Sequence, residues 1–425
     1  MEVFTEYRGP LEFFHGRDEV INPFNRALVH YRRINRGTTF LIKGPPGSGK
    51  TALLYELSEH AKTNGYEVKG SLNAPDFHDP ARMAAKLGVP YKPRKSRGWS
   101  FGLEWLGWRE KKETEMLSDV VDIIKKASSP AGLILVLDEA QHLAKLEGRG
   151  DNEQRAMATL DMIHNGEIGA PVILLAGGLG TTELAFESLG ISRIEESCRV
   201  RLGSLDREST CAVIRDHLVH RCGLDSPPQG WIESLADHSH GWPHHIMCYV
   251  ESAKECLAAS GHQSTPASLQ HTLEVGRDRQ IAYYNVRAHG ITENQRHIIA
   301  RLFAELPLGA TVGKEQILHD LEKEYSEKEA GEVFRRSLRR GVLDERANGA
   351  YAIPIPSMQK WLVIYSTRVN PLTVKHSPIQ GRIRSKESPA TIGGLGGSTE
   401  DQKTRSENQT VLTTFLGNDI RHPSE

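Results

Sequence analysis

The chain has 425 residues, enough for about three domains of average size. Its 53 Lys and Arg residues are balanced by 54 Asp and Glu residues, and the formal net charge of −1 excludes a whole-chain polycation while allowing a local nucleic-acid surface. The strongest apolar run, Ala131 to Leu137, is far shorter than the ~18 residues of a membrane helix, so we expect no membrane partner. Five cysteines without CxxC spacing, and no signal-peptide pattern, predict a reduced, cytoplasmic protein.

Short apolar runs alternate with helical patterns through the first half of the chain. This alternation is typical of a mostly parallel sheet covered by helices. We therefore predict an α/β domain over residues 1–205, with residues 90–112 as an insertion. The runs predict strands at Thr38–Lys43, Tyr66–Leu72, Leu133–Leu137, Val172–Ala176 and Val200–Leu202.

Strand patterns end after residue 205. Residues 206–288 contain four helical patterns, separated by Pro227-Pro228 and by Gly241-Trp242-Pro243. They predict a small all-helical domain with helices at Arg207–Arg221, Gln229–His238, Pro243–Ser260 and Pro266–Tyr284.

A third pattern follows His289-Gly290, which we interpret as a hinge. Thr292 with Gln295 three residues later is a capping box that opens a helix. Three helices and a β-hairpin over residues 289–370 predict a winged helix. The elements are helices at Thr292–Leu306, Val312–Lys323 and Ser326–Arg340, then a hairpin around Asn348-Gly349. Residues 371–425 are rich in Ser, Thr, Gly and Asn and predict a disordered tail.

The segment after the first predicted strand fits G-x-x-x-x-G-K-[ST] without a mismatch. Glycines let backbone N–H groups turn toward phosphate oxygens, and the following helix N-terminus adds partial positive charge. The lysine brings a charge to the β- and γ-phosphates, and the threonine hydroxyl can bind Mg²⁺. A glycine-rich turn without a ligand is the alternative. The pattern predicts a nucleotide site formed by Gly44, Pro45, Pro46, Gly47, Ser48, Gly49, Lys50 and Thr51.

Two acidic residues end the third predicted strand. Asp138 and Glu139 directly follow Leu133–Leu137. Asp138 can hold Mg²⁺ through water, and Glu139 can polarise an attacking water molecule. Solvated acids at an ordinary strand end are the alternative. Together with the P-loop, the pair favours a Mg²⁺-dependent ATPase.

A P-loop, an adjacent Asp-Glu pair and a helical domain after them resemble the AAA+ ATPases. The predicted winged helix narrows the resemblance to the initiator clade of origin-recognition and helicase-loader proteins, with related prokaryotic ATPases of mobile elements and defence systems. The resemblance covers roughly residues 10–365. It implies a homo-oligomer that binds ATP between adjacent subunits, with the helical domain as a lid.

The resemblance also implies roles for residues outside these motifs. Arg17, in Phe14-His15-Gly16-Arg17, lies where the family cups the adenine. Thr181 follows the fourth strand and takes the sensor-1 position, with an ordinary turn residue as the alternative. Arg193 resembles the arginine finger that a neighbouring subunit places at the γ-phosphate. Arg199 and Arg201 are alternative candidates for this role. Alternatively, Arg193 is an ordinary solvated surface arginine.

His244 departs from the family pattern. It follows Gly241-Trp242-Pro243, where the family usually carries a sensor-2 arginine. A neutral imidazole is a weaker phosphate partner than a guanidinium. We therefore expect weak nucleotide sensing by the lid, or slow hydrolysis.

Two segments are candidate nucleic-acid surfaces. The helix Ser326–Arg340 ends in four arginines that could contact DNA phosphates, namely Arg335, Arg336, Arg339 and Arg340. However, residues 291–365 contain 11 basic and 11 acidic residues, and a helix C-terminus favours arginine in any case, so protein docking is the alternative. The segment Tyr91–Lys112 interleaves basic residues with Trp and Phe, which fits either base stacking or packing on the ATPase domain.

These patterns predict an ATP-binding and hydrolysing AAA+ switch. It would assemble with nucleotide and act on DNA, or hand DNA to a partner enzyme. A STAND-like signalling or defence ATPase is the alternative, in which the winged helix packs on the ATPase and docks protein. An adaptor that binds ATP but barely hydrolyses it is a third hypothesis, supported by His244 and the glycines before Thr181.

Overall fold

The computed structural model describes residues 13–92, 117–146, 150–191, 193–346 and 349–368. It divides the chain into Met1–Asn370 and Pro371–Glu425. The predicted tail and most of the predicted insertion, from residue 93 onward, lie outside the described residues. Within the described part, no helix combines the length and the apolar character that crossing a membrane requires. The predicted domain boundaries inside residues 1–370 remain predictions.

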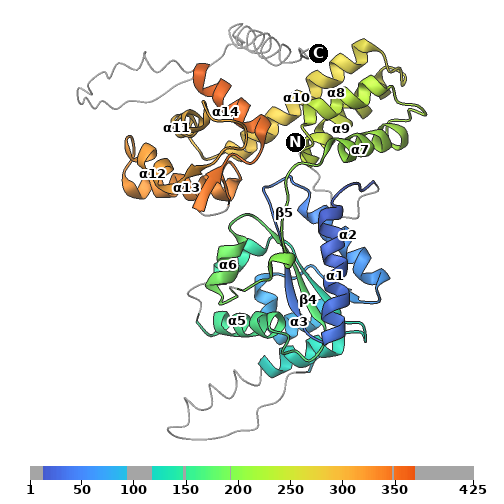
Figure 1. The fold of residues 1–425 in the computed structure, drawn as a ribbon, viewed down its shortest axis with the longest axis vertical. Coiled ribbons are helices and arrows are strands. Elements are labelled where there is room, and N and C mark those ends of the chain that lie inside the picture. Colours follow the sequence, from blue (N-terminus) through green and yellow to red (C-terminus); the bar gives the residue numbers. More distant parts are fainter. Residues whose placement is uncertain (1–12, 93–116, 147–149, 192, 347–348, 369–425) are drawn as a thin grey trace, which may run out of the picture. The chain divides into compact units, whose positions relative to one another are not determined.

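A five-stranded parallel sheet forms the centre of the first domain (Figure 1). Every predicted strand is present, within a few residues at each end. The spatial order is β2-β3-β4-β1-β5, and all neighbouring strands pair in parallel. The strands are β1 (Thr38–Lys43), β2 (Glu67–Lys69), β3 (Leu133–Leu137), β4 (Val172–Gly178) and β5 (Arg199–Arg201).

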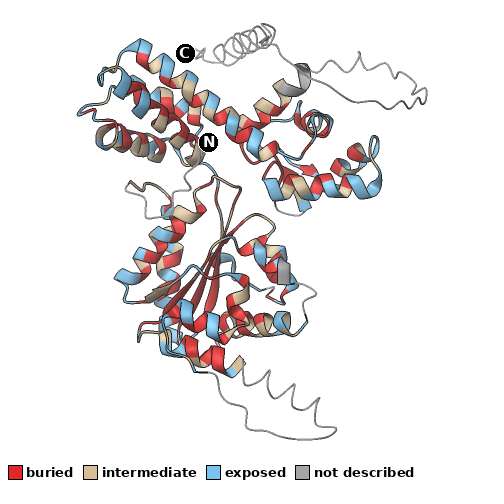
Figure 2. Ribbon diagram, turned by 180° about the vertical axis from the view of Figure 1, so that it is seen from behind, coloured by how far each residue is buried: buried red, intermediate tan, exposed pale blue. Residues whose placement is uncertain are grey.

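Helices cover both faces of this sheet, which explains why its central strands are apolar throughout. All seven residues of β4 are buried, and Figure 2 shows the strands as the most continuously buried part of the domain. The helices are α1 (Asp18–Ile34), α2 (Lys50–Thr63), α3 (Pro80–Leu87), α5 (Asp151–His164) and α6 (Thr182–Ser188). Short 3-10 turns lie at η1 (Ala74–Phe77), η2 (Ala140–Leu146) and η3 (Glu196–Cys198).

The register of the sheet places three chain segments at one edge. Lys43 at the end of β1 lies beside Gly178 of β4, and Leu137 at the end of β3 lies beside Ala176. In parallel sheets, ligands bind beyond the carboxyl ends of the strands. The P-loop, the acidic pair after β3 and the tip of β4 therefore meet at this edge.

The helical domain that follows has the four predicted helices. Asp206 caps the first of them by accepting a hydrogen bond from the Ser209 N–H. The last helix continues four residues beyond the predicted end at Tyr284, which brings Arg287 into the helix. The helices are α7 (Arg207–His220), α8 (Gln229–Ser239), α9 (Pro243–Ala259) and α10 (Pro266–Ala288). We call them the lid.

The three helices and the β-hairpin predicted for the next segment are also present. Thr292 forms a capping box at the first of these helices. Ser326 forms another at the last helix, which Gly341 ends with φ 70°. The elements, which we call the C-terminal domain, are α11 (Glu293–Phe303), β6 (Val312–Gly313), α12 (Lys314–Glu322), α13 (Glu327–Arg340), β7 (Asp344–Glu345), β8 (Ala350–Ala352) and α14 (Pro356–Arg368). The strands are antiparallel in the order β6-β8-β7. Helix α14, which packs on α11, was not predicted.

Gly276 is expected to be essential for packing α10 against α9. A Cβ atom at this buried helical position would lie 2.2 Å from Cδ1 of Tyr249. We expect Gly276→Ala to lower the free energy of unfolding by about 1–3 kcal/mol through overpacking. Gly230 in α8 is the matched control, because a Cβ there meets no atom within 4 Å, and Gly230→Ala should stabilise by up to ~1 kcal/mol. Urea unfolding followed by circular dichroism measures both, and equal shifts would contradict the packing argument.

Candidate nucleotide-binding site

The predicted P-loop joins β1 to α2 and wraps around the start of that helix. Gly47 and Gly49 have φ values of 77° and 88°, a region that side-chain-bearing residues rarely adopt. Gly49 is the N-cap of α2, so the first N–H groups of the helix lie next to the loop. These N–H groups have no acceptor within a helix, and they favour an anion. The predicted strand–loop–helix context is therefore present.

Lys50 is folded back onto the loop. Its Nζ donates to the carbonyl oxygens of Gly44 and Pro45, both at 2.9 Å, and only 7% of the residue is exposed. Burial lowers the pKa of Lys50 to about 8, although the nearby carboxylates of Glu139 and Asp138 act in the opposite direction. The two carbonyl contacts hold the ammonium group beside the position that phosphates would take.

Thr51 and the acidic pair after β3 come together. The Thr51 hydroxyl donates to a carboxylate oxygen of Asp138 at 2.7 Å. Glu139 has φ 54° and donates its own N–H to the other Asp138 oxygen at 2.9 Å. The sheet edge thus brings together an oxygen pair suited to Mg²⁺ and a second carboxylate beside it.

Gln141 is a site residue that the sequence reasoning missed. Its side-chain NH₂ donates to a carboxylate oxygen of Glu139, and its carbonyl oxygen accepts from the Leu179 N–H at 3.1 Å. A Cβ atom at Gly178 would lie 2.7 Å from that carbonyl oxygen. The glycine-rich tip of β4 therefore allows Gln141 to link the tip with Glu139. A polar residue two positions after Glu139 was the available signal.

Thr181, the sensor-1 candidate, does not line the nucleotide cavity. It caps α6 without a side-chain hydrogen bond to the helix and is not among the residues that line the cavity. Leu179 and Gln141 line the cavity at this edge instead.

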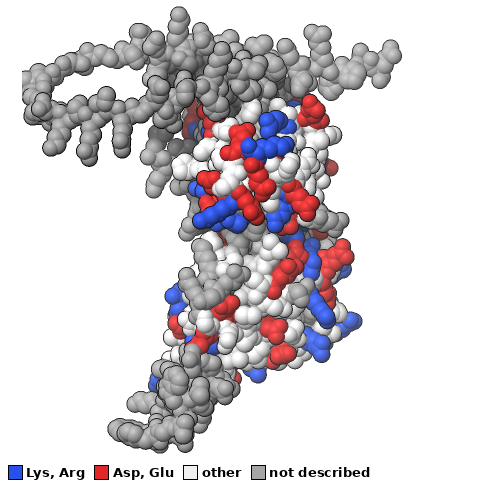
Figure 3. Space-filling view, turned by 90° about the vertical axis from the view of Figure 1, so that its left-hand side faces the viewer, with Lys and Arg blue, Asp and Glu red and all other residues white. Residues whose placement is uncertain are grey.

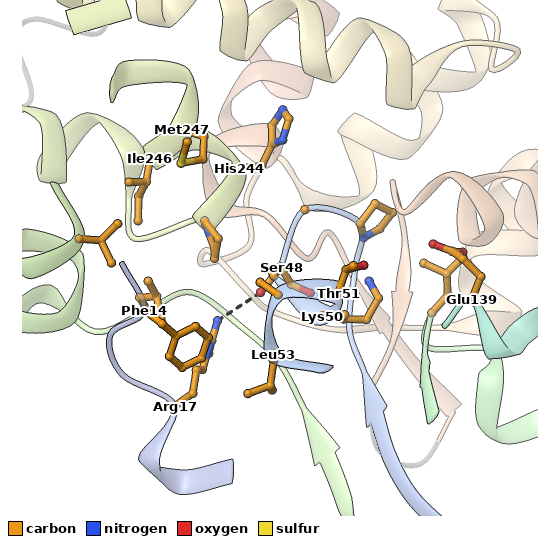
Figure 4. A pocket seen from close by; sticks show the side chains of 18 of the residues that line it. Phe14, Arg17, Ser48, Lys50, Thr51, Leu53, Glu139, His244, Ile246 and Met247 are labelled. Atoms are coloured by element: carbon orange, nitrogen blue, oxygen red, sulfur yellow. Dashed lines mark hydrogen bonds between the residues drawn. The ribbon is translucent and has the colours of Figure 1, made fainter. Parts of the chain in front are cut away.

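A cavity of about 570 Å³ lies between the P-loop, the lid and the N-terminal segment. Figure 4 shows Glu139 on one side of Lys50 and Thr51, and Phe14 and Arg17 on the other. The walls away from Glu139 are largely apolar, which suits a nucleobase. They include Phe13, Phe14, Leu53, Leu205, Val213, Ile246 and Met247.

Arg17 ties three segments together at the apolar end of the cavity. Its guanidinium donates to the carbonyl oxygens of Ser48, Gly203 and Ser204 at 3.3, 2.6 and 3.5 Å. It is 8% exposed, and burial lowers its pKa. Arg17 lines the cavity as well, so it shapes the wall where the resemblance places adenine.

The lid reaches the P-loop through His244. The His244 N–H donates to the Gly47 carbonyl at 3.2 Å, and the imidazole stacks on Tyr283 with ring centroids 4.1 Å apart. Burial, and secondarily the charge of Arg287, lower the pKa of His244 to about 4. The imidazole is therefore neutral at pH 7 and brings no positive charge to a phosphate.

Two arginines from other elements line the same cavity. Arg287 lies near the end of α10, with its guanidinium carbon 5.0 Å from the centroid of the Tyr283 ring. Arg339, which was predicted as a DNA contact, lies near the end of α13. Sequence reasoning missed Arg287 because it ended the helix at Tyr284.

The three finger candidates differ in their surroundings. Arg199 pairs with Glu183 at 2.7 Å, and Arg201 pairs with Asp344 of the C-terminal domain. Arg193 is exposed on the segment before η3. Of the candidates, Arg193 is thus the exposed one, as a residue that acts in a neighbouring subunit must be.

The other predicted DNA contacts are spread over different surroundings. Arg336 donates to the Gly290 carbonyl and is partly buried. Arg335 lines a shallow groove between α12 and α13. Arg340 is exposed. Arg335 and Arg339 are exposed as well, so three of the four arginines are exposed near the end of α13, and their contact with DNA stays a prediction.

Comparisons with known proteins support the motif-based interpretation. Residues 33–183 match the family described as AAA domain. No curated protein matches the sequence. Among solved structures, the ORC2 protein of Aeropyrum pernix, in complexes with ADPNP and ADP, is 14% identical with a TM-score of 0.52, over 86% of this chain and 96% of that one.

Two further solved structures are less similar in fold. The ORC1 protein of Aeropyrum pernix in complex with DNA has 16% identity and a TM-score of 0.41, covering 85% of this chain and 96% of that one. Cdc6p of Pyrobaculum aerophilum has 13% identity and a TM-score of 0.40, covering 86% and 96%. Residues 33–183 thus match an AAA domain, and the fold of the chain is similar to that of the ORC2 protein of Aeropyrum pernix.

Proposed function

We propose that the chain binds ATP with Mg²⁺, hydrolyses it, and uses the difference between its ATP and ADP states as a conformational switch. The observation that carries this proposal is the 2.7 Å contact between Thr51 and Asp138 beneath the P-loop, with Glu139 beside it in the cavity. A glycine-rich turn without a ligand gives no reason for this arrangement. The nucleotide complexes of the similar archaeal ORC2 protein also support ATP as the ligand.

The residues present fit both ligands. Lys50 can turn from the carbonyls of Gly44 and Pro45 toward phosphate oxygens, because both contacts are ordinary 2.9 Å hydrogen bonds. The Thr51 hydroxyl and the Asp138 carboxylate are hard oxygen ligands of the kind that Mg²⁺ prefers. When bound there, Mg²⁺ would neutralise charge on the β- and γ-phosphates.

Glu139 would orient and polarise the attacking water molecule. Gln141 holds Glu139 by a hydrogen bond to one carboxylate oxygen and is itself held by the backbone of Leu179. The tip of β4 thereby orients the Glu139 carboxylate through Gln141. Proton abstraction by a positioned group contributes about 10²–10⁴-fold to a rate.

We further propose that the chain assembles into a homo-oligomer in which Arg193 completes the site of a neighbouring subunit. Its exposure and its place before β5 support this role. Arg199 and Arg201 are engaged within their own chain by Glu183 and Asp344. A guanidinium at the γ-phosphate would stabilise charge in the transition state.

Action on DNA, or transfer of DNA to a partner enzyme, remains the first candidate for the role of the switch. Exposed Arg335 and Arg340 on α13 support it. Figure 3 shows basic and acidic side chains mixed on the face drawn there, without a basic stripe. A DNA contact on this face would thus depend on a few arginines rather than on a broad positive field.

Signalling through a protein partner is the second candidate, and one observation favours it. The C-terminal domain contacts the ATPase domain through Arg201 and Asp344, and Arg339 faces the nucleotide cavity. A STAND-like arrangement predicts such packing. Adaptor behaviour with little hydrolysis is consistent with the neutral imidazole of His244.

Glu139→Gln should retain ATP and lose turnover. Removing the carboxylate is expected to reduce the hydrolysis rate by about 10²–10⁴-fold, while ATP affinity stays within a few-fold because the P-loop is intact. Glu187→Gln, on the exposed side of α6, is the control and should hydrolyse normally. Phosphate release and equilibrium binding measure the two effects. Negligible turnover in the unaltered protein would support the adaptor hypothesis instead.

Nucleotide affinity should fall above about pH 8. The pKa of Lys50 is lowered to about 8, so the ammonium is charged below this pH and must regain a proton on binding above it. The dissociation constant for Mg-ADP should therefore rise with a slope approaching about tenfold per pH unit. Lys50→Met should bind more weakly without this slope. Calorimetric titrations across the range test this, and identical slopes in both proteins would refute it.

A mixing experiment tests whether Arg193 acts in the neighbouring subunit. Arg193→Ala and Lys50→Ala should each be inactive alone. Their mixture should recover part of the ATPase rate, because some interfaces combine an intact finger with an intact P-loop. Lys50→Ala mixed with Glu139→Gln is the control and should recover nothing, since both defects lie on one side of the interface. An inactive first mixture would argue against a finger supplied by Arg193 to another subunit.

A further inference from the structure

The C-terminal domain touches the nucleotide-binding machinery at three points. Gly341, just after α13, lies against Pro46 of the P-loop. Asp344 of β7 pairs with Arg201 at the end of β5. Arg339, in the last turn of α13, lines the cavity together with Lys50 and Glu139. All three residues come from one short stretch of chain, so any movement of α13 changes the cavity.

The chain segments approach closely at two glycines. A Cβ atom at Gly341 would lie 2.4 Å from Cδ of Pro46. A Cβ atom at Gly180, which follows β4, would lie 2.3 Å from Oδ1 of Asp344. A side chain at Gly341 would have to displace the Pro46 ring, whereas one at Gly180 would have to displace the Asp344 carboxylate. The turn after α13 therefore rests directly on the loop that would hold the phosphates.

The charges around the cavity favour a ligand with several negative charges. Lys50, Arg287 and Arg339 line it, while Glu139 is the acidic side chain among its lining residues. Arg287 is near enough to lower the pKa of Lys50, and Asp344 is near enough to raise it. The end of α10 and the turn after α13 thus lie on the same cavity as the Lys50 ammonium. A terminal phosphate bound to Lys50 would lie within this group of cations.

The lid carries His244 at the position where the resemblance to AAA+ ATPases implies a phosphate-binding arginine. His244 is neutral at pH 7 and its ring is stacked on Tyr283. A neutral imidazole cannot offset the added charge of a third phosphate as a guanidinium can. Arg287 and Arg339 carry permanent charges and end at the same cavity.

We infer that Arg339, assisted by Arg287, binds the terminal phosphate of a nucleoside triphosphate, so that the C-terminal domain of the same chain distinguishes ATP from ADP. This inference rests on the proposed nucleotide function and assigns α13 to it. The ATP-bound chain would hold its C-terminal domain on the P-loop through Arg339. After hydrolysis and phosphate release, the contact of Arg339 would be lost, while the Gly341 contact and the Asp344–Arg201 pair would remain.

The test compares a triphosphate analogue with the diphosphate. In the full-length chain without DNA, the dissociation constants of Mg-ADPNP and Mg-ADP are measured by calorimetry. Arg339→Ala should weaken ADPNP binding by roughly tenfold or more, as loss of a charged hydrogen bond does, and ADP binding by less than about twofold. Arg301→Ala removes the same charge from an exposed position on α11 and should change neither constant.

A second variant tests the contact without touching a charge. Gly341→Ala would place its Cβ against Pro46 and displace the turn, so the preference for ADPNP over ADP should fall as it does in Arg339→Ala. Gly88→Ala is the matched control. Gly88 also ends a helix, has φ 69° against 70° for Gly341, and a Cβ there meets no atom within 4 Å. Backbone strain alone would affect both variants equally, and equal effects would overturn the inference.

DNA phosphates have the same chemistry as the nucleotide phosphate, so a second experiment tests whether Arg339 binds DNA instead. Duplex DNA binding is measured by fluorescence anisotropy without nucleotide. If Arg339 serves DNA instead, Arg339→Ala and Arg340→Ala weaken duplex binding alike and the ADPNP-to-ADP ratio stays unchanged, which overturns the inference. If the unaltered chain binds neither nucleotide, the proposed function itself is wrong and the inference is wrong with it.

Discussion

The close approach of the lid to the P-loop is the contact on which the rest of the site depends. A Cβ atom at Gly47 would lie 2.7 Å from the Tyr283 hydroxyl and 2.9 Å from Cβ of His244. The Tyr283 hydroxyl donates to the Pro46 carbonyl at 2.7 Å, so the lid is hydrogen-bonded to the backbone of the loop. Because the loop makes this contact with its backbone, and side chains of α9 and α10 make the other half, a shift of the loop is passed directly to these helices.

A buried polar network extends this coupling from the lid to the C-terminal domain. Gln280 of α10 contacts Nδ1 of His245 at 3.0 Å and accepts from the Tyr249 hydroxyl at 3.1 Å. Tyr284 donates to Ser357 of α14 at 2.7 Å. Burial holds the pKa of His245 well below its usual value, so this network is neutral at pH 7. Its hydrogen bonds fix the end of α10 against α14. They thereby join the lid to the C-terminal domain about one helical turn before Arg287.

The sequence was most informative where local chemistry decides the structure. The P-loop, Asp138 and Glu139 were predicted because their spacing and neighbouring strands leave few arrangements. Gln141 and Arg287 were missed for a different reason. Gln141 matters only because Gly178 lets β4 approach it, and α10 reaches Arg287 because Tyr283 and Tyr284 are buried against the lid and α14. Contacts between distant segments set both positions, and single-sequence patterns do not contain them.

The role of Arg339 also depends on a contact between distant segments, which the sequence pattern does not contain. Its spacing with three other arginines predicts a phosphate-binding helix face, and the residue type is right for phosphate. The structure changes which phosphate is within reach, because the turn after α13 lies on Pro46. The Arg201–Asp344 pair holds this turn, and because the Asp344 side chain is only 5% exposed, loss of Arg201 would leave a buried carboxylate without its partner. A ligand that adds one charged contact to the turn can shift the position of the turn, because the shift depends only on the difference in ligand affinity between the two states.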